Sequence, residues 1–178
     1  MMKTNSGFAL GLKGGVIIGF IYAVLLWIKY TFLGNSPFGF WASGFVSYAI
    51  ILTCMVLLGM QRKRNLGGFA EIKDIFQPLF IAVIFIELAY LLFTFYYLNY
   101  LNPDFFEGYK KALAGFGESR NVDAKKVAEQ ISLIAEQQKS SHDFWLMFKG
   151  IFLRWVIVDS VFAMMIAFFL RKKKPENY

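Results

Sequence analysis

The sequence predicts an all-α membrane protein with four transmembrane helices and a helical extracytoplasmic loop between the third and the fourth. Its composition is the first reason: 57% of the 178 residues are hydrophobic and 17% are charged, whereas soluble domains carry about 25% charged residues. The second reason is that the apolar residues form four long runs, each able to cross a bilayer as a helix. We therefore expect residues 1–178 to form one membrane domain.

The first apolar run covers residues 14–33. A signal peptide has a shorter apolar core of roughly 7–15 residues, followed by a small-residue cleavage site. We therefore expect a retained transmembrane helix. Gly15, Gly19 and Ala23 recur every four residues, which places small side chains on one face and would let a second helix approach closely. The alternative is that glycine is simply frequent in membrane helices.

The three other runs cover residues 40–60, 77–101 and 144–170. Between the first two of these, residues 61–73 contain a glycine pair that should break a helix. Pro78 would stand near the start of the third helix, where its missing N–H costs little. The fourth run ends abruptly at a basic tail.

Residues 102–143 form the only long segment expected outside the bilayer. One short helix is predicted from residue 103 to residue 114, ending at Gly115 and Gly117. A second helix, with a narrow apolar stripe, is predicted after Asp123. The two helices are expected to lie on the mouth of the bundle.

The distribution of charge predicts the topology. If both ends and the 61–73 segment are cytoplasmic, the inside holds ten basic and three acidic residues, and the outside segment holds six basic and seven acidic residues. This asymmetry follows the positive-inside rule, so both termini are predicted to be cytoplasmic. The basic cluster is expected to bind anionic lipid, not nucleic acid, because it flanks the apolar runs without a nucleic-acid-binding motif. Its residues are Arg62, Lys63, Arg64, Arg171, Lys172, Lys173 and Lys174.

Two acids are expected at the same membrane depth. At about 1.5 Å per residue, Glu87 lies roughly 15 Å and Asp159 roughly 16 Å from the cytoplasmic ends of their helices. If the helices are neighbours, the carboxyl groups could face each other and share a proton. Arg154 precedes Asp159 by five residues and so lies on a different face, from which it could reach either acid only through a long, bent side chain.

Glu87 also begins a polar stripe, which continues through Tyr90, Thr94 and Tyr97 at three- and four-residue steps. One interpretation is a proton or ion relay, or the floor of a small polar cavity. The other is a structural network that holds helices or subunits together. We favour the structural interpretation, because transporters usually show more helices, internal repeats and broken segments.

Other polar residues give weaker signals. Lys29 and Lys149 lie near the expected outer interface and could extend to it along their own side chains. His142 is the only histidine and follows the pattern of an interfacial or capping residue more closely than that of a ligand or base. The sequence contains no hydrolase, phosphate-binding, dinucleotide or zinc-protease motif, so we expect no metal, no cofactor and no enzymatic activity.

Three stretches resemble a known family: the RKRNLGG loop, the aromatic third helix, and the segment Tyr-Leu-Asn-Pro-Asp-Phe at 100–105. The chain resembles the bacterial domain of unknown function numbered forty-one ninety-nine, found mostly in Bacteroidota. The resemblance implies a four-helix protein of the bacterial inner membrane with a long loop before its last helix, and it brings no catalytic residues. It also implies an accessory role beside polyprenyl-phosphate glycosyltransferases of family two.

These observations favour a non-enzymatic accessory or scaffold subunit of a membrane complex, in which Glu87, Arg154 and Asp159 contact other helices or a partner. Its expected partners are membrane lipids and another membrane protein or a second copy of the chain. The main alternative is a small, oligomeric, proton-linked transporter or channel that uses Glu87 and Asp159. A membrane enzyme acting on lipid-linked substrates is the least favoured alternative.

Overall fold

The computed structural model describes residues 7–173, which are almost entirely helical and include four helices long and apolar enough to cross a membrane. The predicted all-α class and the four spans are therefore confirmed. The elements in chain order are α1 (Gly7–Phe32), α2 (Pro37–Asn65), α3 (Ile72–Tyr96), the π-helical turn η1 (Tyr97–Leu101), α4 (Phe105–Ser119), α5 (Ala124–Ser141), α6 (Phe144–Met147), the π-helical turn η2 (Phe148–Phe152) and α7 (Leu153–Leu170).

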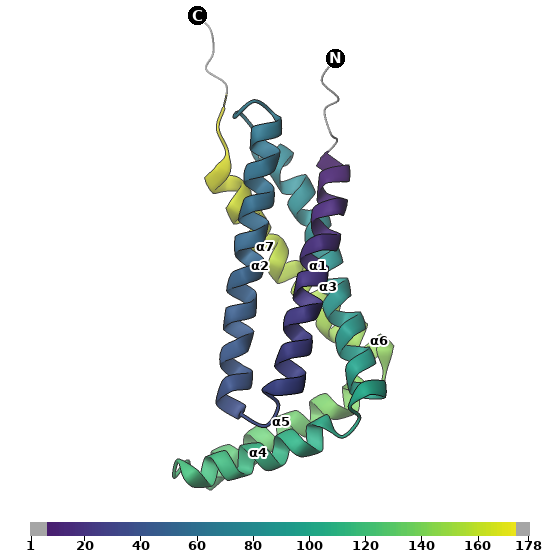
Figure 1. Ribbon diagram of the computed structural model, residues 1–178, viewed down its shortest axis with the longest axis vertical. Coiled ribbons are helices and arrows are strands. Elements are labelled where there is room, and N and C mark those ends of the chain that lie inside the picture. Colours follow the sequence, from purple (N-terminus) through teal and green to yellow (C-terminus); the bar gives the residue numbers. More distant parts are fainter. Residues whose placement is uncertain (1–6, 174–178) are drawn as a thin grey trace, which may run out of the picture.

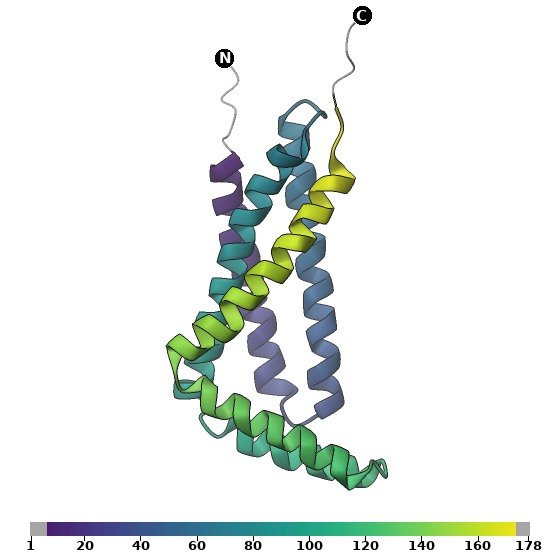
Figure 2. The same ribbon diagram turned by 180° about the vertical axis from the view of Figure 1, so that it is seen from behind.

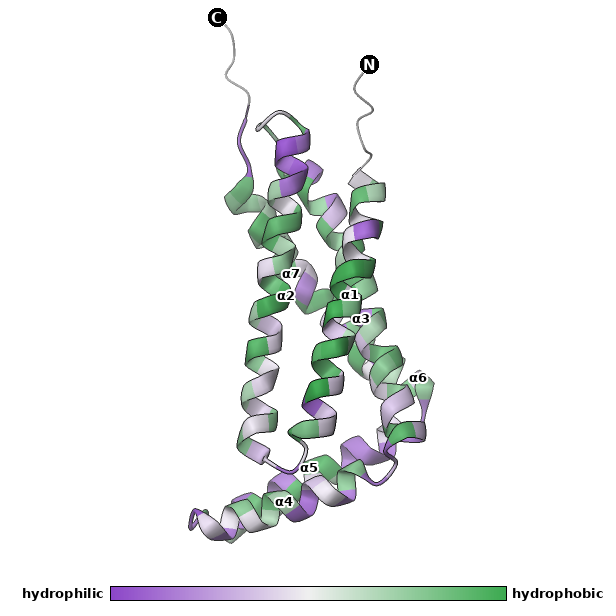
Figure 3. Cartoon of the chain, in the orientation of Figure 1, coloured by the Kyte–Doolittle hydropathy of each residue, from purple (hydrophilic) through white to green (hydrophobic). Residues whose placement is uncertain are grey.

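The four spans form an elongated bundle (Figure 1). The ends of α1 and α7 nearest the two termini lie at one end of the bundle, together with the α2–α3 connection, and we call this the termini end. The α4–α5 pair crosses the opposite end, which we call the hairpin end (Figures 1 and 2). Hydrophobic residues dominate the middle of the bundle and hydrophilic residues gather at both ends (Figure 3). The start of α1 and the end of α7 therefore lie on the same side of the apolar zone.

The most extensive helix contact is between α1 and α3, and glycines make this approach possible. A Cβ atom added at Gly15 would lie 2.9 Å from the Cα of Ala82, and one added at Gly19 would lie 3.1 Å from a backbone oxygen of α3. Gly11 extends the same contact by one turn, with an added Cβ 2.7 Å from an α3 carbonyl oxygen. Ala23, one turn beyond Gly19, is half-buried. The small-residue face predicted from the sequence thus points at α3.

The interior divides into two clusters. An aliphatic cluster fills the termini half of the bundle, and its fully buried members include Ile75, Leu79, Ala82, Val83, Ala163 and Ala167. An aromatic cluster at the hairpin end joins α1, α3 and α4, with Leu26, Tyr30, Tyr97, Leu98, Phe105 and Phe106. At its centre, the ring of Tyr30 lies 5.0 Å from that of Phe105 and 5.2 Å from that of Tyr97, measured between centroids. This aromatic packing attaches the α4–α5 pair to the spans.

Pro78 is not near a helix start, because α3 begins at Ile72 and so contains the proline. A proline has no N–H, so the carbonyl of Asp74, four residues earlier, loses its usual donor. Arg62 supplies a replacement: its Nε donates to the Asp74 carbonyl oxygen at 3.2 Å. The Arg62 side chain is 9% exposed. Arg62 was predicted only as part of a basic cluster, but in the fold it also completes α3.

This substitution of one donor for another is testable. We expect Arg62→Ala to lower stability by about 1.5–3 kcal/mol, the range for a hydrogen bond to a charged group. In a Pro78→Ala background the backbone N–H is restored, so the same Arg62→Ala change should cost clearly less. Thermal unfolding in detergent measures both effects, with the exposed Arg64→Ala as the control for loss of charge. Equal costs in the two backgrounds would show that Arg62 does not compensate for the proline.

α2 is longer than predicted, because the basic residues 62–64 form its last helical turn. Cations are favourable there, where the helix dipole is negative. The chain reverses only at Gly67 and Gly68, whose φ angles are +76° and +86°. These values lie in the left-handed region that glycine adopts without strain. The glycine pair therefore marks where the chain leaves α2. The connection between α2 and α3 is shorter than the loop of residues 61–73 that the sequence predicted.

α4 is also longer than predicted, since it continues through Gly115 and Gly117 to Ser119. A Cβ atom added at Gly117 would lie 2.5 Å from a methyl carbon of Val127 in α5. Gly117 therefore serves the close packing of α5 on α4 and does not end the helix. Glycine lowers helix propensity by about 1 kcal/mol, and contacts of this kind offset such a cost.

The third and fourth spans each contain a π-helical turn near the hairpin end, at 97–101 and 148–152, which the sequence did not predict. The first turn presents Asn99, whose side-chain amide donates to the carbonyl oxygen of Ser141 at 2.9 Å. The Nδ1 atom of His142 lies 2.8 Å from the Asn99 side-chain oxygen. His142 directly follows α5 as its C-cap, so these contacts attach the end of α5 to the third span.

Candidate functional site

Glu87 on α3 and Asp159 on α7 meet inside the bundle. Both are buried, with exposed fractions of 5% and 3%, and their side chains lie close enough to interact with each other. The hydroxyl of Tyr48 on α2 donates to Asp159 Oδ1 at 2.7 Å. Two neighbouring carboxyl groups in an apolar interior are expected to share a proton, because two negative charges there would repel strongly. We call Glu87 and Asp159 the acid pair, and Tyr48 is the tyrosine that donates to it.

The acid pair adjoins the aliphatic cluster on the side of the hairpin end. Toward the termini end, the next inward-facing residues are Val83 on α3 and Ala163 on α7, both 0% exposed. Leu79 and Ala167 continue this closed packing by one further turn. Among the described residues, the aliphatic cluster therefore closes the bundle on that side of the acids. Any access to the acid pair comes from the hairpin half.

The polar stripe of α3 continues from the acid pair toward the hairpin end. The ring of Tyr90 stacks on that of Tyr22 of α1, with centroids 5.7 Å apart and planes 13° from parallel. Thr94 is buried, and its hydroxyl lies near the phenols of Tyr30 and Tyr90 but forms no hydrogen bond of ordinary geometry within the described chain. Tyr97 then packs against Tyr30. The predicted stripe is thus one row along the α1–α3 interface.

A cavity of about 760 Å³ adjoins the acid pair, within the range of about 300–1,000 Å³ for small-molecule sites. It lies among α1, α2, α3 and α7, and residues of α4 and α5 cover it at the hairpin end. Its wall is mostly apolar and strongly aromatic. The lining residues used below are Lys29, Trp41, Gly44, Phe45, Tyr48, Glu87, Gln130, Ile134, Gln137 and Trp155.

Lys29 points into this cavity. Its Nζ atom lies 4.2 Å from the centroid of the Phe40 ring, and a Cβ atom added at Gly44 would lie 3.6 Å from it. We expected Lys29 to extend to the membrane surface. The structure instead accommodates it inside, because Phe40 offers a cation–π contact and Gly44 leaves space. Within residues 7–173, Lys29 forms no ion pair.

Arg154 is not part of this network. It is exposed and makes no ion pair or hydrogen bond within the part of the chain that the structure describes. Five residues at 3.6 per turn place it about 140° around the helix from Asp159. The acid pair receives a hydrogen bond from Tyr48, and Arg154 lies on a different face of the helix.

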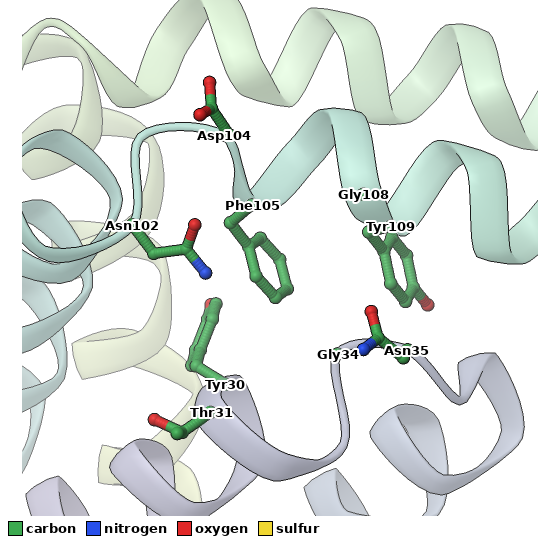
Figure 4. A pocket seen from close by; sticks show the side chains of 9 residues that line it. All are labelled: Tyr30, Thr31, Gly34, Asn35, Asn102, Asp104, Phe105, Gly108 and Tyr109. Atoms are coloured by element: carbon green, nitrogen blue, oxygen red, sulfur yellow. The ribbon is translucent and has the colours of Figure 1, made fainter.

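A second, smaller cavity of about 240 Å³ lies where the α1–α2 turn meets the start of α4 (Figure 4). Tyr30, Phe105 and Tyr109 present their rings to it, and Asn35 and Asn102 present their amides. The carboxylate of Asp104 points away from it (Figure 4). Tyr109 also lines the larger cavity, and its partial burial raises the pKa of its phenol. Tyr109 is thus shared by the two cavities.

The basic cluster gathers at the termini end. Ala70 and Lys172 exchange two backbone hydrogen bonds of 3.0 Å, which hold the end of the fourth span beside the α2–α3 connection. Arg171, Lys172 and Lys173 therefore lie at the same end of the bundle as residues 62–64. Lys174, predicted as part of this cluster, is outside the described residues.

Sequence reasoning found the acid pair from matching depth and gave a small polar cavity as one interpretation of the α3 stripe, but it did not predict the mostly apolar, aromatic lining. The lining residues come from six helices and have no common spacing, so no local pattern marks them. In residues 7–173, no group of three or more His, Cys, Asp or Glu side chains is placed to hold a metal ion.

Comparison with known proteins identifies a family without an assigned activity. The chain matched no curated protein and no solved structure. A family model described as a protein of unknown function, DUF4199, matches residues 13–172, which include all four spans and the α4–α5 pair. This multi-pass membrane protein therefore belongs to the DUF4199 family.

Proposed function

We propose that the protein is a non-enzymatic subunit of a membrane complex and that the exposed face of α7 contacts its partner. The observation that carries this proposal is Arg154. It lies ten residues into the fourth span, roughly 15 Å along the helix from Phe144, and it is exposed without an ion pair among the described residues. A charge deep in a membrane costs at least ~2.5–3.5 kcal/mol. An acidic group on a partner helix would offset that cost.

The rest of this face suits a helix–helix contact. Arg154 shares one side of the helix with Ile157, Val161, Met165 and Phe168, all of them exposed. In the most apolar window of the fourth span, 17% of residues are buried, against 28–39% in the other three. The fourth span thus has the largest share of its surface without a contact inside the described chain. Interhelical polar contacts in a bilayer are worth about 0.6–2 kcal/mol each, so one acid opposite Arg154 would help to orient the partner.

The test asks whether formation of the complex depends on Arg154. We expect the tagged protein, purified in mild detergent, to carry a stoichiometric membrane partner or a second copy of itself, and Arg154→Gln to reduce that association about tenfold. The monomer should stay folded, because Arg154 makes no internal polar contact within the described chain. Lys149→Gln, an exposed cation on the same span, is the matched control. If the complex forms equally well with Arg154→Gln, the proposal that this face of α7 contacts the partner is wrong.

Quantitative mass spectrometry of the purified sample identifies the partner. The family resemblance suggests a polyprenyl-phosphate glycosyltransferase, and we propose it as the first candidate. A complex with that enzyme would place the chemistry in the partner and leave this chain an accessory role. If instead the complex is a homo-oligomer, the acid on the partner helix must come from a second copy of this chain.

A second function is supported by one observation: Glu87 of the acid pair lines the cavity. A proton held by the carboxyl groups could therefore exchange with whatever fills the cavity, as a proton-linked transporter or channel requires. In reconstituted vesicles, this alternative expects a proton flux that Glu87→Gln and Asp159→Asn abolish while assembly is retained. Such a result would count against the scaffold proposal.

A further inference from the structure

We propose that the cavity between α2 and α7 binds one acyl chain of an anionic lipid, with the lipid headgroup against Lys29. This inference does not depend on the proposed partner contact, because Arg154 does not line the cavity. The α7 residues that do, Trp155, Val158 and Phe162, lie about 40–100° around the helix from it. The inference rests on the position of the opening, on the charge at its mouth and on the apolar wall.

The opening is on the side of the bundle. Near the termini end α2 and α7 touch, since a Cβ atom added at Gly59 would lie 2.8 Å from a methyl carbon of Leu170. Toward the hairpin end the two helices diverge (Figures 1 and 2). Trp41 and Phe45 on α2 and Trp155 on α7 line the cavity there and are exposed, at 62%, 62% and 42%. The cavity is therefore reached from the surface that would face lipid.

The charge at the mouth is positive and uncompensated. Lys29 and Glu87 are the only charged side chains among the residues that line the cavity. Glu87 interacts with Asp159 at the inner end, and within residues 7–173 Lys29 forms no ion pair with any acid. An ammonium in a partly buried site is stabilised by an anion within hydrogen-bonding distance. The lining thus offers one anion site, at Lys29.

The α5 helix, which covers the cavity at the hairpin end, adds uncharged hydrogen-bond donors to this site. Gln130, Ile134 and Gln137 fall on one face of α5, at steps of four and three residues, and all three line the cavity. Their amide groups can donate to phosphate or ester oxygens beside the lysine. Lys29 and the two glutamines together match a phosphodiester headgroup. They lie at the hairpin end, where the lipid headgroups of that leaflet are expected.

The wall selects a lipid over a free anion. Between Lys29 and Tyr22 the cavity extends seven residues along α1, roughly 10 Å, past mostly aromatic side chains. Inorganic phosphate would satisfy Lys29 and leave this apolar length without a partner. An acyl chain would fill it and reach the acid pair at the inner end. Aromatic walls with a few polar groups at one end are typical of sites for apolar ligands.

The test compares lipids with identical chains and different headgroups. We expect full-length protein, delipidated in mild detergent and mixed with phosphatidylglycerol or phosphatidylcholine, to retain phosphatidylglycerol about tenfold better by native mass spectrometry. Lys29→Gln should abolish this preference. Gly44→Leu should block retention of both lipids, because its side chain enters the cavity where an added Cβ meets only Lys29 Nζ, at 3.6 Å.

Two variants control for charge and volume. Lys149→Gln removes an exposed cation from the fourth span, outside the cavity. Gly115→Leu adds the same side chain on α4, where nothing lies within 4 Å of an added Cβ. Both should bind like the wild type. Elution as a single folded species is checked for each variant, and Lys29→Gln still tests the proposal if Gly44→Leu fails to fold.

Several outcomes would overturn the proposal. Equal retention of both lipids would show that no headgroup site exists. A preference that persists in Lys29→Gln would place the anion elsewhere, such as the basic cluster at the termini end. Retention unchanged in a folded Gly44→Leu variant would show that the chain lies outside the cavity. Displacement of phosphatidylglycerol by millimolar inorganic phosphate would show that the site recognises the anion alone.

Discussion

Replacing Glu87 with leucine is expected to destabilise the protein by about 3 kcal/mol, the upper end for a buried polar group left without its partner. Leucine has a similar size but cannot bond to Asp159, which is 3% exposed and would keep only Tyr48. Glu87→Gln should cost little, because its amide can donate to Asp159 as the shared proton does. Tryptophan fluorescence during thermal unfolding in detergent measures both variants.

The control for the acid pair is Glu136→Leu, which removes an exposed acid from α5 and should leave the unfolding midpoint unchanged within about 0.5 kcal/mol. If glutamine proves as damaging as leucine, the site needs an ionised carboxylate and the proton is not shared. If leucine proves harmless, the acid pair contributes nothing to stability, which would favour its use as a relay.

The second large effect is expected at the α1–α3 contact. Gly15→Leu should prevent the two helices from meeting, because even a Cβ atom would lie 2.9 Å from the Cα of Ala82, a backbone atom that cannot move aside alone. Overpacking of this kind costs typically 1–3 kcal/mol, and a leucine at a backbone contact belongs at the upper end. We expect a marked fall in folded protein, measured as the monodisperse fraction after extraction, with Gly15→Ala intermediate.

Gly44→Leu is the matched control for this change. It places the same side chain in a transmembrane helix, but an added Cβ there meets only Lys29 Nζ at 3.6 Å, an ordinary contact. The yield of folded Gly44→Leu should therefore stay close to that of the wild type. Similar yields for the two leucine variants would mean that the α1–α3 approach is not held by glycine.

Helix ends and helix partners were harder to predict than the helices themselves. The glycine pair at 67–68 ends α2 as its chemistry requires, whereas Gly115 and Gly117 do not end α4. The difference is tertiary, because Gly117 packs closely on Val127 from a different helix. Pro78 was placed too near a helix start for a similar reason, since the Arg62 donor that permits a proline inside α3 is contributed by α2.

The sequence was sufficient to predict the class, the four spans and the common depth of Glu87 and Asp159. Apolar run length and helical rise are local properties, and they translate directly into membrane crossing and depth. The three-dimensional fold was needed to show that α3 and α7 are neighbours, that Arg154 faces outward and that Lys29 faces a cavity. These depend on the rotation and crossing of whole helices. The rotation and crossing are set by contacts between residues far apart in the sequence, such as Gly15 and Ala82.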